Sequence, residues 1–401
     1  MKKIVIIALP ALALIASCSK TEVTPVQSDP QQISFFTLVN RQGTKADAII
    51  SGTAYPTDET FGTFAYFNAK GTTFPTDAEL YIPNSEVTNS TKAKTGTVWT
   101  TNPAYYWPKQ GTLAFYSYSP WDELYLTTKC DTTNGITIGT DTTPWDVSAH
   151  QTVDVMVADL ISGQNKNIEP DATGATEVVN PSTYTGVPTI FRHKLAQIVK
   201  FTFKTDKDYL GTGTKAGDKK FYINSIAINN IDYSGVYVSG QKVSKTDLGA
   251  WTVKNTDSKD YVWFEQGTNN DTNIFGSTGT VVNANKLDAA SSSYILVLPQ
   301  DFTEPTGEVS AAKNIQITYT ISTYNGKDWV DETVKDVYAS LWAVQGGKAA
   351  NGSTAAVKAS SWEMNKKYSY TITIGLDQIY WAPSVVDWEE ANAFEYTIPN
   401  A

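Results

Sequence analysis

The chain has 401 residues, of which 41% are hydrophobic and 12% aromatic, and its formal net charge at pH 7 is −10. This apolar content can form packed cores and argues against a disordered chain, while the length favours two or three domains. An acidic chain without a basic block does not supply the phosphate neutralisation that nucleic-acid binding requires, so we expect no nucleic-acid partner.

Residue types that carry common chemistry are scarce. The sequence has two cysteines, Cys18 and Cys130, and two histidines, His150 and His193. This excludes a disulfide-rich scaffold and leaves little room for zinc or histidine-based chemistry. Nucleophile elbows, H-E-x-x-H patterns, calcium loops and phosphate-binding glycine motifs do not occur. We therefore expect a protein that is not an enzyme, with no catalytic residues, no metal and no cofactor.

Residues 1–17 have the features of a signal peptide. Two lysines precede an apolar stretch, Ile4 to Ala16, which is too short for a comfortable bilayer span. Small residues then lead into Cys18, and this resembles a bacterial lipoprotein signal, in which the cysteine is acylated after cleavage. Several acyl chains anchor a protein far better than one. The alternative is an ordinary secretory signal with an incidental cysteine. With Cys18 lipidated, Cys130 is a lone thiol, for which we expect a structural role.

A polar tether with two prolines precedes the first predicted strand. Residues 33–39 alternate between two faces, both largely apolar, with Ile33, Phe35, Thr37 and Val39 on one and Ser34, Phe36 and Leu38 on the other. A polar segment containing Arg41 and Gly43 follows, which predicts an exposed loop. The only other arginine, Arg192, lies in a strand-like segment, so a protease that cuts after arginine but not lysine is expected to cut once.

Further strand patterns recur along the chain. They cover residues 61–67, 112–118, 154–158, 198–203, 222–228, 293–298, 315–321 and 368–374. Period-two alternation is typical of antiparallel sheets with one packed face. Helical patterns are limited to a turn at residues 193–198 and short pieces near Thr57 or Ala78. Two successive β-sandwiches fit the length, with a junction near residues 184–188.

Several short motifs occur in an order that resembles the fimbrillins, the subunit family of type V pili. After the lipoprotein signal and the Arg41 segment they are FGTFAY (61–66), YYWP (105–108), LAFYSYSP (113–120), DVMVA (154–158), FRHKLAQI (191–198), YILVLP (294–299) and a C-terminal segment from Trp381 to Trp388. Each motif alone is weak, but their joint order spans nearly the whole chain.

The resemblance implies an all-β protein with two transthyretin-like antiparallel β-sandwich domains in tandem. The implied segments are the signal peptide (1–17), a tether and removable strand (18–41), an N-terminal sandwich (42–187) and a C-terminal sandwich (188–401). It also implies a structural fimbrial subunit on the outer membrane and cell surface that supports adhesion to a host or bacterial ligand. The family includes stalk, anchor and tip subunits alike.

The resemblance further implies how the subunit is activated. A lipidated precursor would be cut by an arginine-specific protease between Arg41 and Gln42, which would remove the strand carrying Ile33, Phe35, Phe36, Leu38 and Val39. Another pilin subunit would then fill the groove by strand exchange. Read without the family, Arg41 is a solvated loop residue.

The last apolar segment of the chain is the candidate donor strand. It carries Ile379, Trp381, Val385, Val386 and Trp388. The alternative is a final strand packed within its own domain, and Pro383 limits that strand to an edge or a bulge. The acidic extension from Glu389 onward argues against a simple donor role.

A different function, glycan binding by a surface lipoprotein, is the main alternative. It would use exposed aromatic side chains to stack on sugar rings, with Tyr105, Tyr106, Trp107, Trp121 and Trp145 as candidates. In a β-rich chain, however, most aromatic residues pack in cores or in cross-strand pairs.

Overall fold

The computed structural model describes residues 31–39, 53–89, 98–166, 186–266, 274–286, 294–342, 361–375, 379–387 and 398–399, with the backbone alone for 53–54, 333–336, 379–387 and 398–399. The regular secondary structure of these residues is almost all β-strand, which confirms the predicted all-β class. The described helices are short: α1 (Trp121–Leu124) and the 3-10 turns η1 (Val147–Ala149) and η3 (Val309–Ala311). None of them has the length and apolar character that crossing a bilayer requires.

The N-terminal half is built around one nine-stranded sheet. Its strands are β1 (Ser34–Val39), β2 (Thr53–Ala54), β3 (Phe61–Asn68), β4 (Glu79–Asn89), β5 (Trp99–Asn102), β6 (Thr112–Ser119), β10 (Met156–Ala158), β11 (Ile161–Gln164) and β12 (Val187–His193). They follow the order β10-β12-β1-β5-β4-β3-β6-β11, and β10 also pairs with β6. The hydrogen-bonded path therefore closes on itself, and β1 is one of the strands inside the closed path.

The C-terminal half is a sandwich of two sheets. One contains β13 (Ala196–Thr205), β18 (Thr280–Val282), β19 (Ile295–Val297), β24 (Lys366–Ile374), β25 (Ile379–Asp387) and β26 (Ile398–Pro399). The other contains β14 (Lys219–Ile231), β17 (Lys259–Glu265), β21 (Asn314–Tyr324) and β22 (Trp329–Ser340). Side chains of both sheets share one buried core, which includes Phe201, Ile226, Ile317 and Tyr370.

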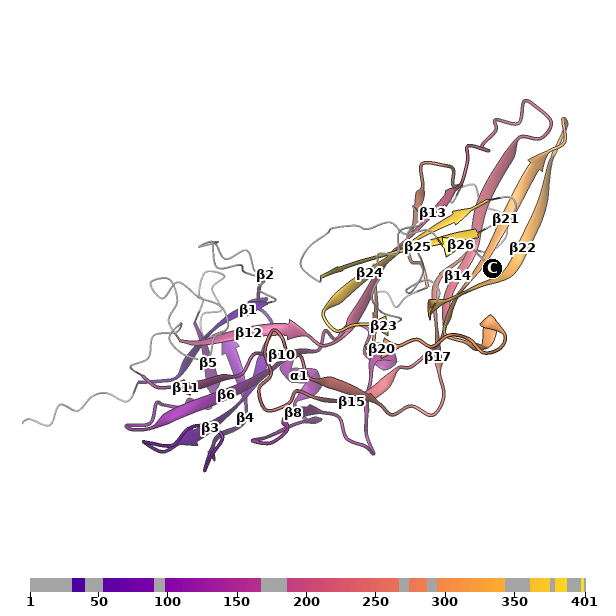
Figure 1. Cartoon of the computed structure of the whole chain (residues 1–401). Coiled ribbons are helices and arrows are strands. Elements are labelled where there is room, and N and C mark those ends of the chain that lie inside the picture. Colours follow the sequence, from indigo (N-terminus) through magenta and orange to yellow (C-terminus); the bar gives the residue numbers. More distant parts are fainter. Residues whose placement is uncertain are drawn as a thin grey trace, which may run out of the picture.

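A five-stranded sheet joins the two halves. It pairs β7 (Thr128–Asp131), β8 (Gly135–Ile138) and β9 (Trp145–Asp146) with β15 (Ser234–Val238) and β16 (Ala250–Val253) from later in the chain. In Figure 1 β15 extends between the purple N-terminal lobe and the orange and yellow C-terminal lobe. A small sheet of β20 (Gln300–Asp301) and β23 (Ser361–Trp362) lies near this junction. The predicted domain division at residues 187 and 188 stays a prediction.

The strand segments predicted from alternation are confirmed, whereas the predicted helical turns are wrong. Within residues 193–198, β12 ends at His193 and β13 begins at Ala196, and the Lys194 amide between the two strands donates to the Val155 carbonyl oxygen at 2.8 Å. Their apolar side chains enter two sheets rather than one helix face. After Ala78 the chain enters β4, and a simple turn lies at Thr57. Most pairings are antiparallel, but β1–β12 and β13–β24 are parallel.

Candidate functional site

The first strand, β1, has hydrogen-bonded neighbours on both of its sides. On one side it runs parallel to β12, in register from Phe35 opposite Val187 to Val39 opposite Phe191. On the other side β5 pairs with its first residues and β2 with its last. Just before the strand, the Ile33 amide donates to the Tyr105 carbonyl oxygen at 2.9 Å. β1 is therefore an interior strand and not an edge strand.

One face of β1 enters the core of the nine-stranded sheet. Ile33 and Phe35 have no solvent exposure, and Val39 is nearly as buried. The Phe35 ring meets two others edge to face, with centroid distances of 5.8 Å to Phe61 and 5.5 Å to Phe115. Such pairs add stabilisation beyond the buried area itself.

Three further aromatic side chains complete this core beside β1. Tyr55 stacks on Phe191 with a centroid distance of 5.0 Å and meets Trp99 edge to face at 5.2 Å. The Tyr55 hydroxyl lies 2.7 Å from Ser119 Oγ, and burial raises the pKa of this phenol above its usual range. We call the space that β1 occupies, bounded by β12, β5 and these rings, the β1 slot.

The opposite face of β1 is buried as well. Phe36 and Leu38 are 2% and 4% exposed. A strand that is covered on both faces is expected to be continuously apolar. This explains why Ser34–Val39 shows little polar alternation.

A glycine fixes how closely β12 approaches β1. Gly186 has a φ of +120°, and a Cβ added to it would lie 2.7 Å from the Ser34 carbonyl oxygen. A side chain at this position would be strained and would also press on the backbone of β1.

The two arginines of the chain have different settings. Arg192, at the end of β12, is 2% exposed and forms a bidentate ion pair with Asp159. It is thus held inside the fold, away from a protease. Arg41 and Gln42, the predicted cleavage site, and Cys18, the predicted lipidation site, lie outside the described residues.

The candidate donor segment forms β25, which pairs along its whole length with β24. Ile379 lies opposite Ile374, Trp381 opposite Ile372, and Val385 opposite Tyr368. Val386 pairs with Lys367, and β26 pairs with β25 at Tyr380 and Trp381. Trp388 lies outside the described residues. In this structure β25 is thus paired within the C-terminal sandwich of its own chain.

Most aromatic residues considered for sugar stacking pack against other side chains. Trp145 is buried and stacks on His150 with a centroid distance of 4.1 Å. Trp107 meets Phe115 edge to face, and Trp121 stacks on Tyr118 and Tyr125. Tyr106 is 43% exposed. The Tyr105 ring lies beside that of Tyr81, with a centroid distance of 6.4 Å.

The remaining reactive side chains are also held in the packing. His193 Nδ1 lies 2.6 Å from Asp154 Oδ2, and half-buried Cys130 packs against core residues. No group of three histidine, cysteine or acidic residues in the described ranges is placed to hold a metal ion.

Sequence reasoning identified the strand but not the slot around it. Tyr55 and Trp99 were not singled out, and Phe61, Phe115 and Phe191 appeared only as parts of motifs. The partnership of β1 with β12 joins residues about 150 positions apart in parallel. Parallel pairing over that separation leaves no local signal, although the density of aromatic residues in those motifs was a clue.

Comparisons with known proteins place this fold in a family. No curated protein matches this sequence. A fimbrial protein from Bacteroides vulgatus has a similar structure at 14% identity and a TM-score of 0.46, with 89% of this chain and 99% of that chain covered. A candidate cell adhesion protein from Bacteroides uniformis is similar at 18% identity and a TM-score of 0.42, with 89% of this chain and 99% of that chain covered. Another, from Parabacteroides distasonis, is similar at 13% identity and a TM-score of 0.43, with 91% of this chain and 98% of that chain covered. The fimbrillin-like family model matches residues 44–388, which is most of the sequence. The chain belongs to the fimbrillin-like family.

Proposed function

We propose that this protein is a structural subunit of a cell-surface fimbria whose first strand is removed so that subunits can join by strand exchange. The precursor is exported as a lipoprotein acylated at Cys18 and reaches the outer membrane. An arginine-specific protease cuts between Arg41 and Gln42, and the subunit then enters a polymer with other pilin subunits.

The observation that carries this proposal is the position of β1. It is a short, separate segment at the start of the fold, yet it is paired on both sides and buried on both faces. Cleavage just after it, at Arg41, would take out the whole strand. Its loss would leave β12 and β5 with unpaired backbone groups facing each other across an apolar groove.

Such a groove has a strong tendency to take up another strand. Unpaired N–H and C=O groups give affinity to an added strand, and side-chain pockets give it register. Full burial of an aliphatic or aromatic side chain contributes roughly 1.5–3 kcal/mol. Ile33, Phe35, Phe36, Leu38 and Val39 are all buried in the slot. A replacement strand with similar side chains therefore gains enough to drive assembly.

The identity of the donor is a separate part of the proposal. The segment from Ile379 to Trp388 supplies the apolar side chains that the slot needs. To donate β25, a subunit has to give up its pairing with β24. Exchange of one set of strand pairs for another is feasible when the new site also buries both faces of the strand.

Proteolysis of the purified precursor tests the proposal. Incubation with an arginine-specific protease is expected to give a new N-terminus at Gln42 by mass spectrometry, together with a ladder of multimers on gels. An Arg41→Lys variant is the matched control and should stay intact and monomeric. Cleavage at Arg41 without multimers would overturn strand exchange, and cleavage elsewhere or none would overturn the processing step.

A further inference from the structure

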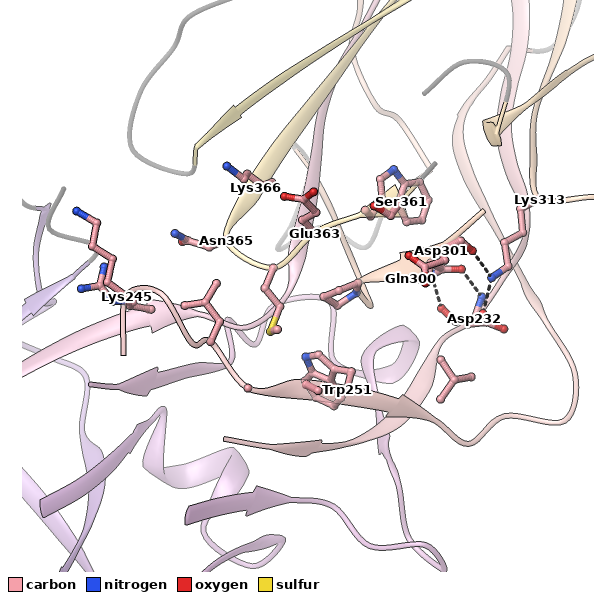
Figure 2. Close-up of a pocket in the computed structure, with 18 residues that line it drawn as sticks. Asp232, Lys245, Trp251, Gln300, Asp301, Lys313, Ser361, Glu363, Asn365 and Lys366 are labelled. Atoms are coloured by element: carbon pink, nitrogen blue, oxygen red, sulfur yellow. Dashed lines mark hydrogen bonds and ion pairs between the residues drawn. The ribbon is translucent and has the colours of Figure 1, made fainter. Parts of the chain in front are cut away.

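A cavity of about 720 Å³ lies near the junction of the two halves of the molecule. Its walls come from β16 and the loop before it, from β20 and β23, and from the turn between β23 and β24 (Figure 2). Arg192 also lines the cavity, and it directly follows Phe191, the last residue of β12 that pairs with β1. The volume is in the range of ligand pockets, which form preferentially where structural units meet.

Trp251 of β16 lies at the base of this cavity (Figure 2). Its Nε1 donates to the Lys194 carbonyl oxygen at 2.6 Å, and its ring lies 5.5 Å from the Tyr237 ring. The indole is thus fixed in place while remaining only partly buried. Leu248 and Met364 extend the apolar surface beside it.

Polar groups at one side of the cavity are held by a hydrogen-bond network. Gln300 Nε2 donates to the carbonyl oxygens of Asp232 and Leu298, each at 3.1 Å. The Asp232 carboxylate accepts from Lys313 Nζ, as Figure 2 shows. Side chains that are already ordered lose little entropy when a ligand binds.

Asn365, across the cavity from this network, has an unmet hydrogen-bonding capacity. Its Oδ1 is buried and has no donor among the residues that the structure describes. Its backbone is fixed, because its φ is +63° and its amide donates to the Leu195 carbonyl oxygen at 3.1 Å. A buried acceptor without a donor costs about 1–3 kcal/mol. The residue lines the cavity, and rotation of its amide toward the cavity would let a ligand hydroxyl donate to Oδ1 and remove that cost.

The charges around the cavity disfavour a strongly charged ligand. Basic and acidic side chains both line it: Arg192, Lys245, Lys313 and Lys366 with Asp232, Asp301 and Glu363. A ligand of either sign would therefore meet like charges. Hydroxyl groups both donate and accept, so they suit such a mixed rim. A peptide binding as an added strand would have only the four residues of β16 to pair with.

We propose that this cavity binds a neutral carbohydrate. A sugar ring lies against the Trp251 indole, and its hydroxyls bond to Asn365 and to the Glu363 carboxylate on the same turn. This gives the subunit a binding function that does not depend on cleavage at Arg41 or on strand exchange. It also differs from sugar stacking on the aromatic residues that the sequence pattern suggested, because Trp251 was not among them.

Affinity electrophoresis of the uncut chain, without its signal peptide, tests the proposal. Gels contain starch, mannan, xylan or mixed-linkage β-glucan as neutral probes, and alginate as a charged one. We expect retardation by at least one neutral polysaccharide. Trp251→Ala and Asn365→Gly should each weaken it about tenfold, whereas Trp121→Ala, which changes a tryptophan outside the cavity, should leave it unchanged. Glycine tolerates the positive φ of Asn365, so this variant keeps its fold even if Trp251→Ala does not.

Three results would overturn the proposal: no retardation by any neutral polysaccharide, retardation that both cavity variants retain, or binding confined to alginate. Because the chain is uncut, a failure of protease-triggered assembly has no influence on this experiment.

Discussion

Arg192 and Asp159 form a bidentate ion pair inside the protein, with Nε–Oδ1 and Nη2–Oδ2 distances of 2.8 and 2.7 Å. Both side chains are almost completely buried. The pair fixes the end of β12, the strand against which β1 lies in parallel. It also keeps the second arginine of the chain inside the fold, which under the proposed processing leaves Arg41 as the site for an arginine-specific protease.

Breaking this pair should destabilise the chain strongly. Asp159→Asn leaves a buried guanidinium without its counter-charge, which typically costs about 3–5 kcal/mol. Urea unfolding followed by tryptophan fluorescence measures the change, and we also expect cleavage at Arg192 to become detectable. The control is Asp141→Asn, which breaks the exposed pair with Lys254 and should change stability by about 0–1 kcal/mol. Equal effects of the two substitutions would contradict this interpretation.

The buried side chains of β1 should stabilise the precursor but not the processed subunit. Phe35→Ala leaves a cavity among Phe61 and Phe115, with an expected loss of about 3–5 kcal/mol for the uncut chain. Thr37→Ala, in the same strand but only half-buried, should cost much less. After cleavage at Arg41 both variants should match the wild type in thermal unfolding. A difference that persists after cleavage would mean that β1 stays bound.

Lys194 should make stability depend on pH. Its side chain is fully buried, its Nζ donates to the Leu248 carbonyl oxygen at 3.2 Å, and burial lowers its pKa from 10.5 to about 7. Between pH 7 and 10.5 the unfolded chain holds the proton of Lys194 more tightly than the folded chain does. The contribution of Lys194 to the free energy of unfolding therefore rises with pH across that window, and this gain is lost as the pH falls toward 7.

Replacement of this lysine tests the pH dependence. We compare the free energy of unfolding of Lys194→Met with that of the wild type at each pH. The variant minus the wild type should be larger at pH 7 than at pH 10, by a few kcal/mol. Lys200→Met, at an exposed position, provides the control. Comparison of each variant with the wild type in urea unfolding at both pH values cancels the titration of all other groups. A difference that is the same at both pH values would refute the role of Lys194.

Cys130 should be a poorly reactive thiol. It packs against the core that joins the two halves, and burial raises its pKa well above the usual value. Because the thiolate is the reactive species, iodoacetamide at pH 8 should label Cys130 slowly in the folded chain and rapidly in urea. A Cys18→Ser background confines the mass-spectrometric readout to this residue. Equally rapid labelling in both states would show that the thiol is accessible and ionised.

The strands could be predicted from the sequence wherever one face packs and the other does not. Alternation in residues 198–203 and 315–321 is a local property, and it located β13 and β21. It failed at residues 193–198, where a short apolar run is compatible with a helix or with two strand ends, and only the sheets on either side decide between them. It also missed β22, in which the adjacent residues Asp331 and Glu332 are both exposed.

By itself, the sequence determined the all-β class, the apolar character of the first strand and the family resemblance, because each depends on side chains close together along the chain. The tertiary structure alone decided that β1 is an interior strand between β12 and β5, that Arg192 is held by Asp159, and that Trp251 and Asn365 face one cavity. These relationships join residues tens to hundreds of positions apart. Their energies come from contacts that exist only once the sheets have closed, so no local pattern encodes them.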